Sequence, residues 1–211
     1  KWTIVFAVRP SARIDALCLQ NSIWFGISCG WSSRYVSRGH MANSQSANAS
    51  TPAANGFSMP AEWEKHEATW LGWPHNASDW PGKFEVIPWV YGEMVRKISA
   101  DEKIFLLVRH KADENFARRV FKHVGVDLRK IQFVTHPTNR GWTRDTGPIF
   151  VRKVESGKRK AETAIVHFHF NGWAKYDNWR KDTKVPETAA KLLDKKLFHA
   201  QCAKISIGNR Q

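Results

Sequence analysis

The chain has 211 residues, of which 42% are hydrophobic, and it carries a formal net charge of +14. This length allows one domain with a packed core, and no apolar run reaches the ~18–20 residues that a membrane-spanning helix needs, so no membrane partner is expected. No nucleic-acid partner is expected either. The charge is spread over helix faces and loops, and the aromatic residues lie beside Pro and Gly in turn-like motifs. The three cysteines have neither disulfide-framework nor metal-site spacing, which favours a reducing compartment.

Residues 1–58 have the composition of a disordered or non-native extension and linker. Residues 1–40 show no sustained hydrophobic period, and a Ser-, Asn- and Ala-rich stretch follows Met41. Two interpretations remain open. Met41 is the true start after an upstream read-through, or the arginines and serines before it form an organelle transit peptide. The first interpretation predicts a cytoplasmic protein and the second an organelle-targeted one.

From Met59 onward the chain alternates strand-like and helix-like patterns, and we expect the ordered part to begin there. Short apolar runs predict buried strands, and apolar residues at helical spacing predict amphipathic helices. The order predicts an α/β chain with mixed strand directions. The expected elements are a helix over 86–100, a strand over 103–109, a helix over 112–124, a strand over 131–135, a hairpin of 148–154 and 164–170 around Ser156-Gly157, and a helix over 185–197.

The most informative segment is 139–151, Asn-Arg-Gly-Trp-Thr-Arg-Asp-Thr-Gly-Pro-Ile-Phe-Val. Gly147 and Pro148 end any helix and set a tight bend before the next strand. Asp145 is therefore expected on a turn at the mouth of a strand, where its carboxylate could point into a pocket and bind a cation. The alternative is an aspartate that only caps the turn.

Three motifs together resemble one protein family. They are Met59–Pro74 (Met-Pro-Ala-Glu-Trp, then His-Glu-Ala-Thr-Trp-Leu-Gly-Trp-Pro), Trp142–Pro148 and Phe170–Tyr176. They look like the agmatine deiminases and the bacterial-type peptidylarginine deiminases, over about residues 59–193. The resemblance implies a pentein-type propeller of ββαβ units around a pseudo-fivefold axis, of which this chain would hold about two of five. Residues 194–211 are read as a divergent tail.

The family resemblance also implies a chemistry, the hydrolysis of a guanidinium group to a ureido group with release of ammonia and without metal or cofactor. Carboxylates bind the planar guanidinium cation, a cysteine thiolate attacks the central guanidinium carbon, and a histidine transfers protons. By this resemblance Asp145 is a clamp carboxylate, Trp142 lines the pocket, and Trp73, Asn171 and Trp173 shape or brace its mouth.

Other residues of these motifs are expected to be structural. Arg144 is expected to brace its loop rather than to contact substrate. Core packing is the expected role of Trp63 and Trp70 in the first motif and of Trp80 and Trp179, which follow the first and third motifs.

The chain departs from the family in its catalytic parts. The family's Glu-Gly-Gly segment and His-x-Asp pair are absent, since the sequence has no Gly-Gly and no histidine followed two residues later by Asp. Cys202 has no glycine before it and is read as an ordinary thiol. We therefore expect neither a nucleophile nor a general acid or base here, and we expect the chain alone to be inactive.

The resemblance favours agmatine as substrate, giving N-carbamoylputrescine in putrescine biosynthesis through a cysteine-linked amidino intermediate. Peptidyl-arginine is the alternative, for which His167 and His169 could hold the extra carboxylate, although alternating His-Phe-His-Phe also fits an ordinary strand. A non-catalytic module that binds guanidines or a partner protein is the further alternative. The intact protein could be a homo-oligomer.

Overall fold

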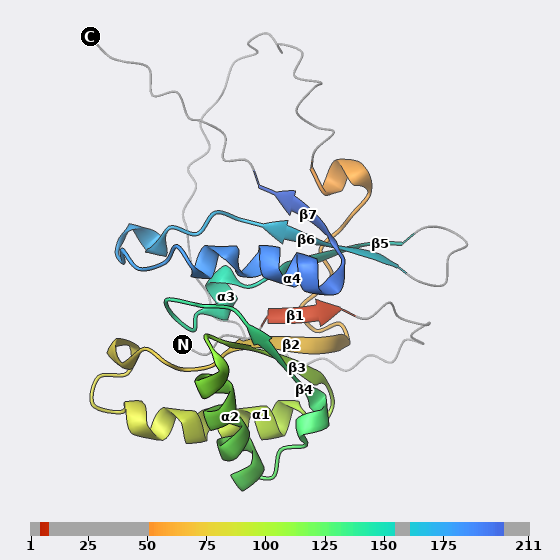
Figure 1. The fold of residues 1–211 in the computed structure, drawn as a ribbon. Coiled ribbons are helices and arrows are strands. Elements are labelled where there is room, and N and C mark those ends of the chain that lie inside the picture. The colour runs from red at the N-terminus through yellow and green to blue at the C-terminus, as the bar shows by residue number, and fades with distance from the viewer. Residues whose placement is uncertain (1–4, 9–50, 155–160, 201–211) are drawn as a thin grey trace, which may run out of the picture.

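A computed structural model describes residues 51–154 and 161–200 and the backbone of residues 5–8 (Figure 1). Its helices are α1 (Ile87–Ile98), α2 (Lys111–His123), α3 (Thr143–Thr146) and α4 (Val185–Leu193). Its strands are β1 (Val5–Val8), β2 (His66–Gly72), β3 (Lys103–Val108), β4 (Ile131–Thr135), β5 (Ile149–Lys153), β6 (Glu162–His167) and β7 (Lys196–His199).

The strands form two sheets of mixed direction, as the sequence predicted. The larger sheet has the order β1-β2-β3-β4, in which β1 is antiparallel to β2 and the other pairs are parallel. The smaller sheet has the order β5-β6-β7, with an antiparallel pair followed by a parallel one. Parallel neighbours need a crossover, which α1, α2 and α4 provide. The arrangement β1-β2-α1-β3 therefore recurs as β5-β6-α4-β7, so the chain contains a ββαβ unit in each sheet.

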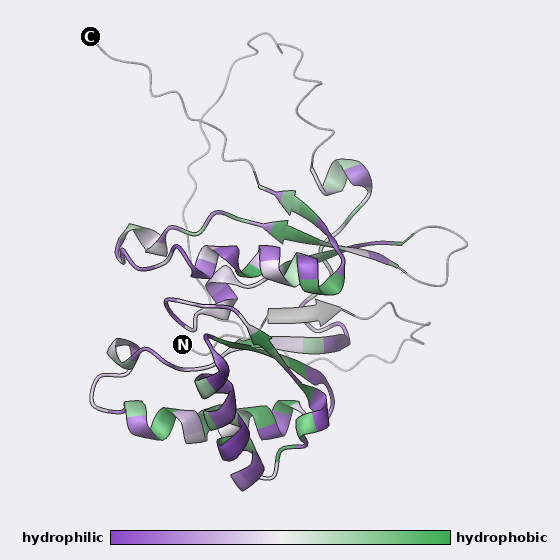
Figure 2. Cartoon of the chain, viewed as in Figure 1, coloured by the Kyte–Doolittle hydropathy of each residue, from purple (hydrophilic) through white to green (hydrophobic). Residues whose placement is uncertain are grey.

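Strand alternation divides the larger sheet into two buried faces. In β3, Ile104, Leu106 and Val108 belong to the cluster beneath α1 and α2, whereas Phe105 and Leu107 belong to the cluster on the opposite face. Because both faces are covered, β3 reads as a continuous apolar run. Figure 2 shows β3 and β6 as mainly hydrophobic and α2, at the surface, as mainly hydrophilic.

The cluster on the opposite face joins the two sheets into one body. Trp70 and Phe105 of the larger sheet stack with ring centroids 4.6 Å apart. They share this cluster with Phe150 of β5, Ile165 of β6 and Val185 of α4. Helix α4 thus packs between its own sheet and the larger one, as Figure 1 shows.

Several elements differ from the sequence-based expectation, and the expected strand over 164–170 is β6, which ends at His167. The last helix ends at Leu193, because Asp194 adopts a left-handed conformation (φ 49°), and the chain then forms β7. The expected helix over 185–197 was therefore wrong in its last turn. Residues 196–199 are a strand because Phe198 is buried in the smaller sheet while Leu197 packs on the joint cluster. Strand β2, which we did not predict, is buried over five consecutive residues.

Packing also begins earlier than Met59. Phe57 is 7% exposed and its ring lies 5.5 Å from that of Phe198, and Ser58 pairs with Arg152 through two backbone hydrogen bonds. Strand β1 lies within the segment that we read as an extension. The remaining residues of that segment up to 50, and the expected Ser156-Gly157 turn, fall outside the described residues.

Candidate functional site

The candidate site lies at the carboxyl ends of the three parallel strands of the larger sheet. Ligands of open α/β sheets usually bind at this edge. His75 follows β2, Arg109 follows β3, and Thr138 and Arg140 follow β4. His75 Nε2 and Thr138 Oγ1 are 2.9 Å apart, and this contact links the segments that follow β2 and β4. Arg109 Nε donates to Asp113 at 2.7 Å, which links the end of β3 to the first turn of α2.

Asp145, predicted on a turn at the mouth of a strand, lies on the single helical turn α3 at this edge, shortly before β5 begins at Ile149. The Asp145 N–H donates to the Trp142 carbonyl at 3.1 Å, and Thr146 donates to the same oxygen through its N–H and its hydroxyl. The extended Gly147 (φ −74°, ψ 171°) then ends the helix ahead of Pro148, as predicted. Asp145 is exposed on this short helix.

The loop that carries Asp145 lies directly on the end of β2. A Cβ atom added to Gly72 would lie 3.1 Å from the Cα of Gly141, which is closer than most real Cβ contacts. Only glycine at position 72 allows this approach of backbone to backbone without a shift. The motif over 170–176, which follows β6 in the second ββαβ unit, packs against the same loop.

That second segment completes an aromatic cluster with Trp142. The ring of Trp142 lies 4.9 Å from that of Trp173 and 5.1 Å from that of Tyr176, and Phe170 lies 5.1 Å from Trp173 at right angles. Trp173 is 52% exposed and has a left-handed backbone (φ 56°), which is uncommon for a non-glycine residue, and such strained positions cluster at functional sites. The exposed Asn171 precedes it as the N-cap of the Gly172–Ala174 turn.

Trp73, in contrast, lies in the core and not at the mouth of the site. It is 2% exposed and packs edge-on against Tyr91, Phe116 and Phe121, at centroid distances of 5.6 to 6.2 Å. It continues the alternation of β2, and its N–H bonds the Leu107 carbonyl, so its side chain falls on the face covered by α1 and α2. The predicted role of Trp73 at the mouth is therefore corrected to core packing.

The tryptophans that we expected in the core divide into three groups. Trp70 is fully buried, as predicted, and Trp80 and Trp179 are half-buried. Trp63 is 88% exposed, so its predicted core position was wrong. Arg144, which we expected to brace its loop, donates to Glu62 at 3.1 Å, but both side chains are exposed, so this pair adds little to the stability of the loop.

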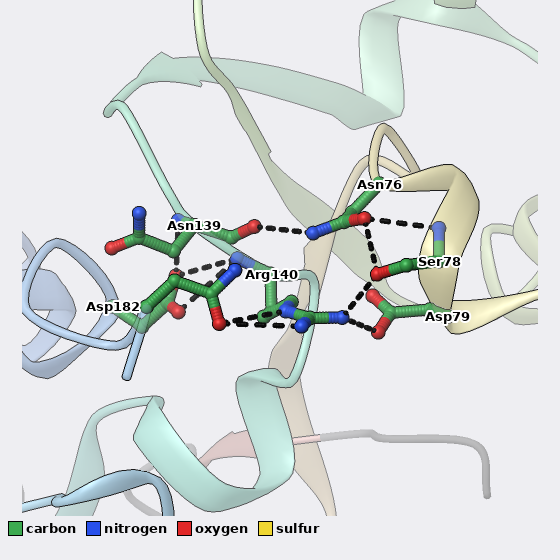
Figure 3. A network of polar contacts seen from close by, with 7 residues as sticks. Asn76, Ser78, Asp79, Asn139, Arg140 and Asp182 are labelled. Carbon is green, nitrogen blue, oxygen red and sulfur yellow. Dashed lines mark hydrogen bonds and ion pairs between the residues drawn. The ribbon is translucent and has the colours of Figure 1, made fainter. Parts of the chain in front are cut away.

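A network around Arg140 lies beneath the aromatic cluster, and sequence reasoning missed it. The Arg140 guanidinium pairs with Asp79, donates to Ser78 Oγ at 2.8 Å and to Asn178 Oδ1 at 3.2 Å (Figure 3). Its central carbon lies 4.9 Å from the Trp142 ring centroid and 5.1 Å from that of Tyr176. Arg140 is only 8% exposed. Nothing in the sequence distinguishes it from the other basic residues, because its side-chain partners lie 38 to 62 positions away.

Asp182 supports the same loop through its backbone. Its fully buried carboxylate accepts from the N–H of Asn139 at 2.8 Å and from that of Arg140 at 3.1 Å, and Asn139 Oδ1 in turn accepts from the Lys181 N–H at 2.9 Å. Burial raises the pKa of Asp182 to about 6, although the two backbone N–H groups and the Arg140 charge favour its ionised form.

The two histidines that we considered for binding a substrate carboxylate do not join the cluster. His167 is directed towards α4, with Nδ1 3.8 Å from Glu187 and its ring 5.2 Å from that of His199. Burial lowers the pKa of His167, so it is neutral at neutral pH. The ring of His169 lies 5.4 Å from Trp179.

Two open depressions lie away from this site. The larger one, about 590 Å³, is lined by residues of α4 and β7, and the smaller one, about 380 Å³, by Val90, Glu93, Met94 and Lys97 of α1.

Among the described residues, no three His, Cys, Asp or Glu side chains are placed to hold a metal ion. Within the same residues, no helix has the length and apolar character to cross a bilayer. All three cysteines, Cys18, Cys29 and Cys202, lie outside them.

Comparison with known proteins places this fold in a family. Agmatine deiminases of Medicago truncatula and Ectopseudomonas mendocina are 34% and 32% identical to the chain, each over 68% of it and over 38% and 37% of their own lengths. A solved agmatine deiminase of Enterococcus faecalis matches 72% of the chain and 40% of its own, with 25% identity and a TM-score of 0.61. The chain thus spans about two fifths of the length of these relatives.

A second solved relative carries a ligand. It is a Campylobacter jejuni agmatine deiminase with a Cys→Ser substitution and substrate bound, which matches 69% of the chain and 40% of its own with 26% identity and a TM-score of 0.56.

The fold is accordingly α/β and pentein-type, with about two of five units. A sequence model described as Porphyromonas-type peptidyl-arginine deiminase matches residues 58–205, which extends past Leu193, where we expected the likeness to end. The chain belongs to this family of Porphyromonas-type peptidyl-arginine deiminases.

Proposed function

We propose that this chain supplies a guanidinium-binding part of an agmatine deiminase-like hydrolase. The intact enzyme would convert agmatine to N-carbamoylputrescine and ammonia, in the formation of putrescine, through a cysteine-linked amidino intermediate. The observation that carries the proposal is the exposed Asp145 on α3 next to an aromatic cluster of Trp142, Trp173 and Tyr176 at the carboxyl edge of a parallel sheet.

This arrangement suits a flat cation. A carboxylate can accept two parallel N–H bonds from a guanidinium group, and an aromatic face attracts the same cation over its ring. Trp142 and Asp145 share one short helix, with Trp142 as its N-cap, so the ring and the carboxylate are held on the same rigid turn. We propose that Asn171 lies at the rim, since it begins the turn that carries Trp173.

Agmatine is the preferred substrate over peptidyl-arginine, which the family description names as the alternative. A substrate with a carboxylate would need a cation to bind it. His167 does not meet this need, because it is neutral at neutral pH and directed towards Glu187 on α4. A non-catalytic guanidine-binding module remains the second candidate, since the same Asp145 and Trp142 would serve it.

Calorimetric titration of the chain with agmatine tests the proposal. Asp145→Asn removes the negative charge and one strong acceptor, so we expect agmatine affinity to fall at least about tenfold. Asp177→Asn, at an exposed acid near the aromatic cluster, is the matched control and should leave affinity unchanged. Putrescine, which lacks the guanidinium group, should bind more weakly than agmatine. Equal affinity of native chain and Asp145→Asn for agmatine would refute the proposal.

A further inference from the structure

Arg140 connects three segments that are distant in sequence. Its guanidinium bonds Ser78 and Asp79 after β2 and Asn178 after the aromatic segment, while its own backbone belongs to the loop that follows β4. The same planar group lies near the rings of Trp142 and Tyr176, at 4.9 and 5.1 Å. Its side chain is 9% exposed and that of Asp79 is 7% exposed, so water is nearly excluded from the pair.

A buried guanidinium with this set of partners can fix geometry in a way that a lysine cannot. Its fork makes several bonds in one plane, and that plane stacks against aromatic rings. Removing one partner of a buried pair leaves an uncompensated charge, which is strongly unfavourable. Arg140 and Trp142 share one loop, and the Trp142 ring packs close to the guanidinium group.

We propose that Arg140 is a positioning residue, which holds Trp142 and, through α3, Asp145 in place for a guanidinium ligand without contacting that ligand. The seat that Asp79, Asn178 and the rings of Trp142 and Tyr176 form around Arg140 is shaped for a guanidinium group. The effect of Arg140 on ligand binding rests on the proposed function above, whereas its effect on the conformation of the 139–146 loop does not.

Hydrogen exchange of the backbone tests control of the loop without any ligand. In Arg140→Ala, the amides of the 139–146 loop should exchange at least about tenfold faster, while that of Leu106 in the buried β3 should stay within about twofold. Arg144→Ala is the matched control, since Arg144 is exposed on the same loop, and should leave exchange unchanged. Unchanged loop exchange in Arg140→Ala would overturn the proposal. Equal acceleration at Leu106 would also overturn it, because Arg140 would then only stabilise the whole fold.

Chemical rescue adds a readout that a general structural role would not produce. Millimolar ethylguanidinium should fill the vacated seat in Arg140→Ala and restore slow loop exchange, whereas ethylammonium should not. Ethylguanidinium should have no effect on the native chain or on Arg144→Ala. The double variant Arg140→Ala, Asp79→Asn should lose the rescue. Failure of rescue, or equal rescue by ethylammonium, would contradict a seat built for a guanidinium group.

Arg140→Lys covers the case in which the alanine variant does not fold, because it keeps a charge opposite Asp79. It should accelerate loop exchange about three- to tenfold and weaken agmatine binding at least about fivefold, with Leu106 unchanged. Native loop exchange in this variant would overturn the proposal. If the native chain does not bind agmatine, the proposed function fails, and loop exchange and rescue still decide whether Arg140 positions the loop.

Discussion

The two aspartates of the site differ in burial. Asp145 is exposed on α3, whereas Asp182 is fully buried and its pKa is raised to about 6. A carboxyl group with a raised pKa binds its proton more tightly in the folded than in the unfolded chain. Its protonated form therefore stabilises the fold below about pH 4, and this contribution is lost as the pH rises through about 6.

Asp182→Asn should remove this pH dependence. The free energy of unfolding of the native chain, relative to the variant, should decline between pH 4 and pH 6 by an amount of the order of 1–3 kcal/mol. Urea unfolding of both proteins at pH 4, 5, 6 and 7 measures the difference. A native advantage that grows with pH over this range would show that the carboxylate is stabilised in its charged form.

The tryptophans of the motifs should separate by role when each is truncated. Trp73→Ala opens a cavity in the core and should lower the free energy of unfolding by about 3–5 kcal/mol. Trp173→Ala, at a half-exposed ring, should change it by less than about 1 kcal/mol but weaken agmatine binding about two- to fivefold. Urea unfolding and calorimetry measure both effects. A stable Trp73→Ala protein with lost binding would instead place Trp73 at the site.

Among the elements, the contact between the end of β2 and the site loop is the most sensitive to a small change. Gly72→Ala would bring a methyl group within 3.1 Å of the Gly141 Cα, so backbone must move. We expect a loss of about 1–2 kcal/mol in the free energy of unfolding and faster exchange of the loop amides. Exchange that rises only in the core, with the loop unaffected, would contradict this contact.

The hydrophobic pattern of the sequence predicted those helices and strands whose own residues show a clear period or a continuous apolar run. The strand over 131–135 matches β4, and the helices over 86–100 and 112–124 match α1 and α2 with small differences at their ends. Strands β2 and β7 were missed because their burial comes from distant partners. The short run around Phe198 becomes a strand only by pairing with β6.

The same division holds for the site. The motifs predicted Asp145, Trp142 and Trp173 as site residues, and the structure brings Trp142 and Trp173 together. The motifs could not show that Trp73 is buried, since its face depends on the alternation of β2. They also could not show the role of Arg140, whose side-chain partners come from both units.

At the scale of the whole molecule, the two ββαβ units share one hydrophobic cluster, and the site lies where their loops meet. The sequence has no Gly-Gly and no histidine followed two residues later by Asp, so it lacks the catalytic segments that the family resemblance implies, and we propose that this chain binds agmatine without hydrolysing it. An ammonia-release assay at saturating agmatine should give no signal above background. Turnover that disappears on treatment with a thiol reagent would contradict this and would implicate one of the chain's own cysteines.

The position of a bound guanidinium group is the most direct test of the account. A crystal structure of the chain with agmatine should show the guanidinium nitrogens at about 2.7–2.9 Å from the Asp145 carboxylate, with the planar group near the Trp142 and Trp173 rings. Agmatine bound elsewhere, for instance in the depression beside α4 and β7, with Asp145 contacting only the protein, would contradict the central claim.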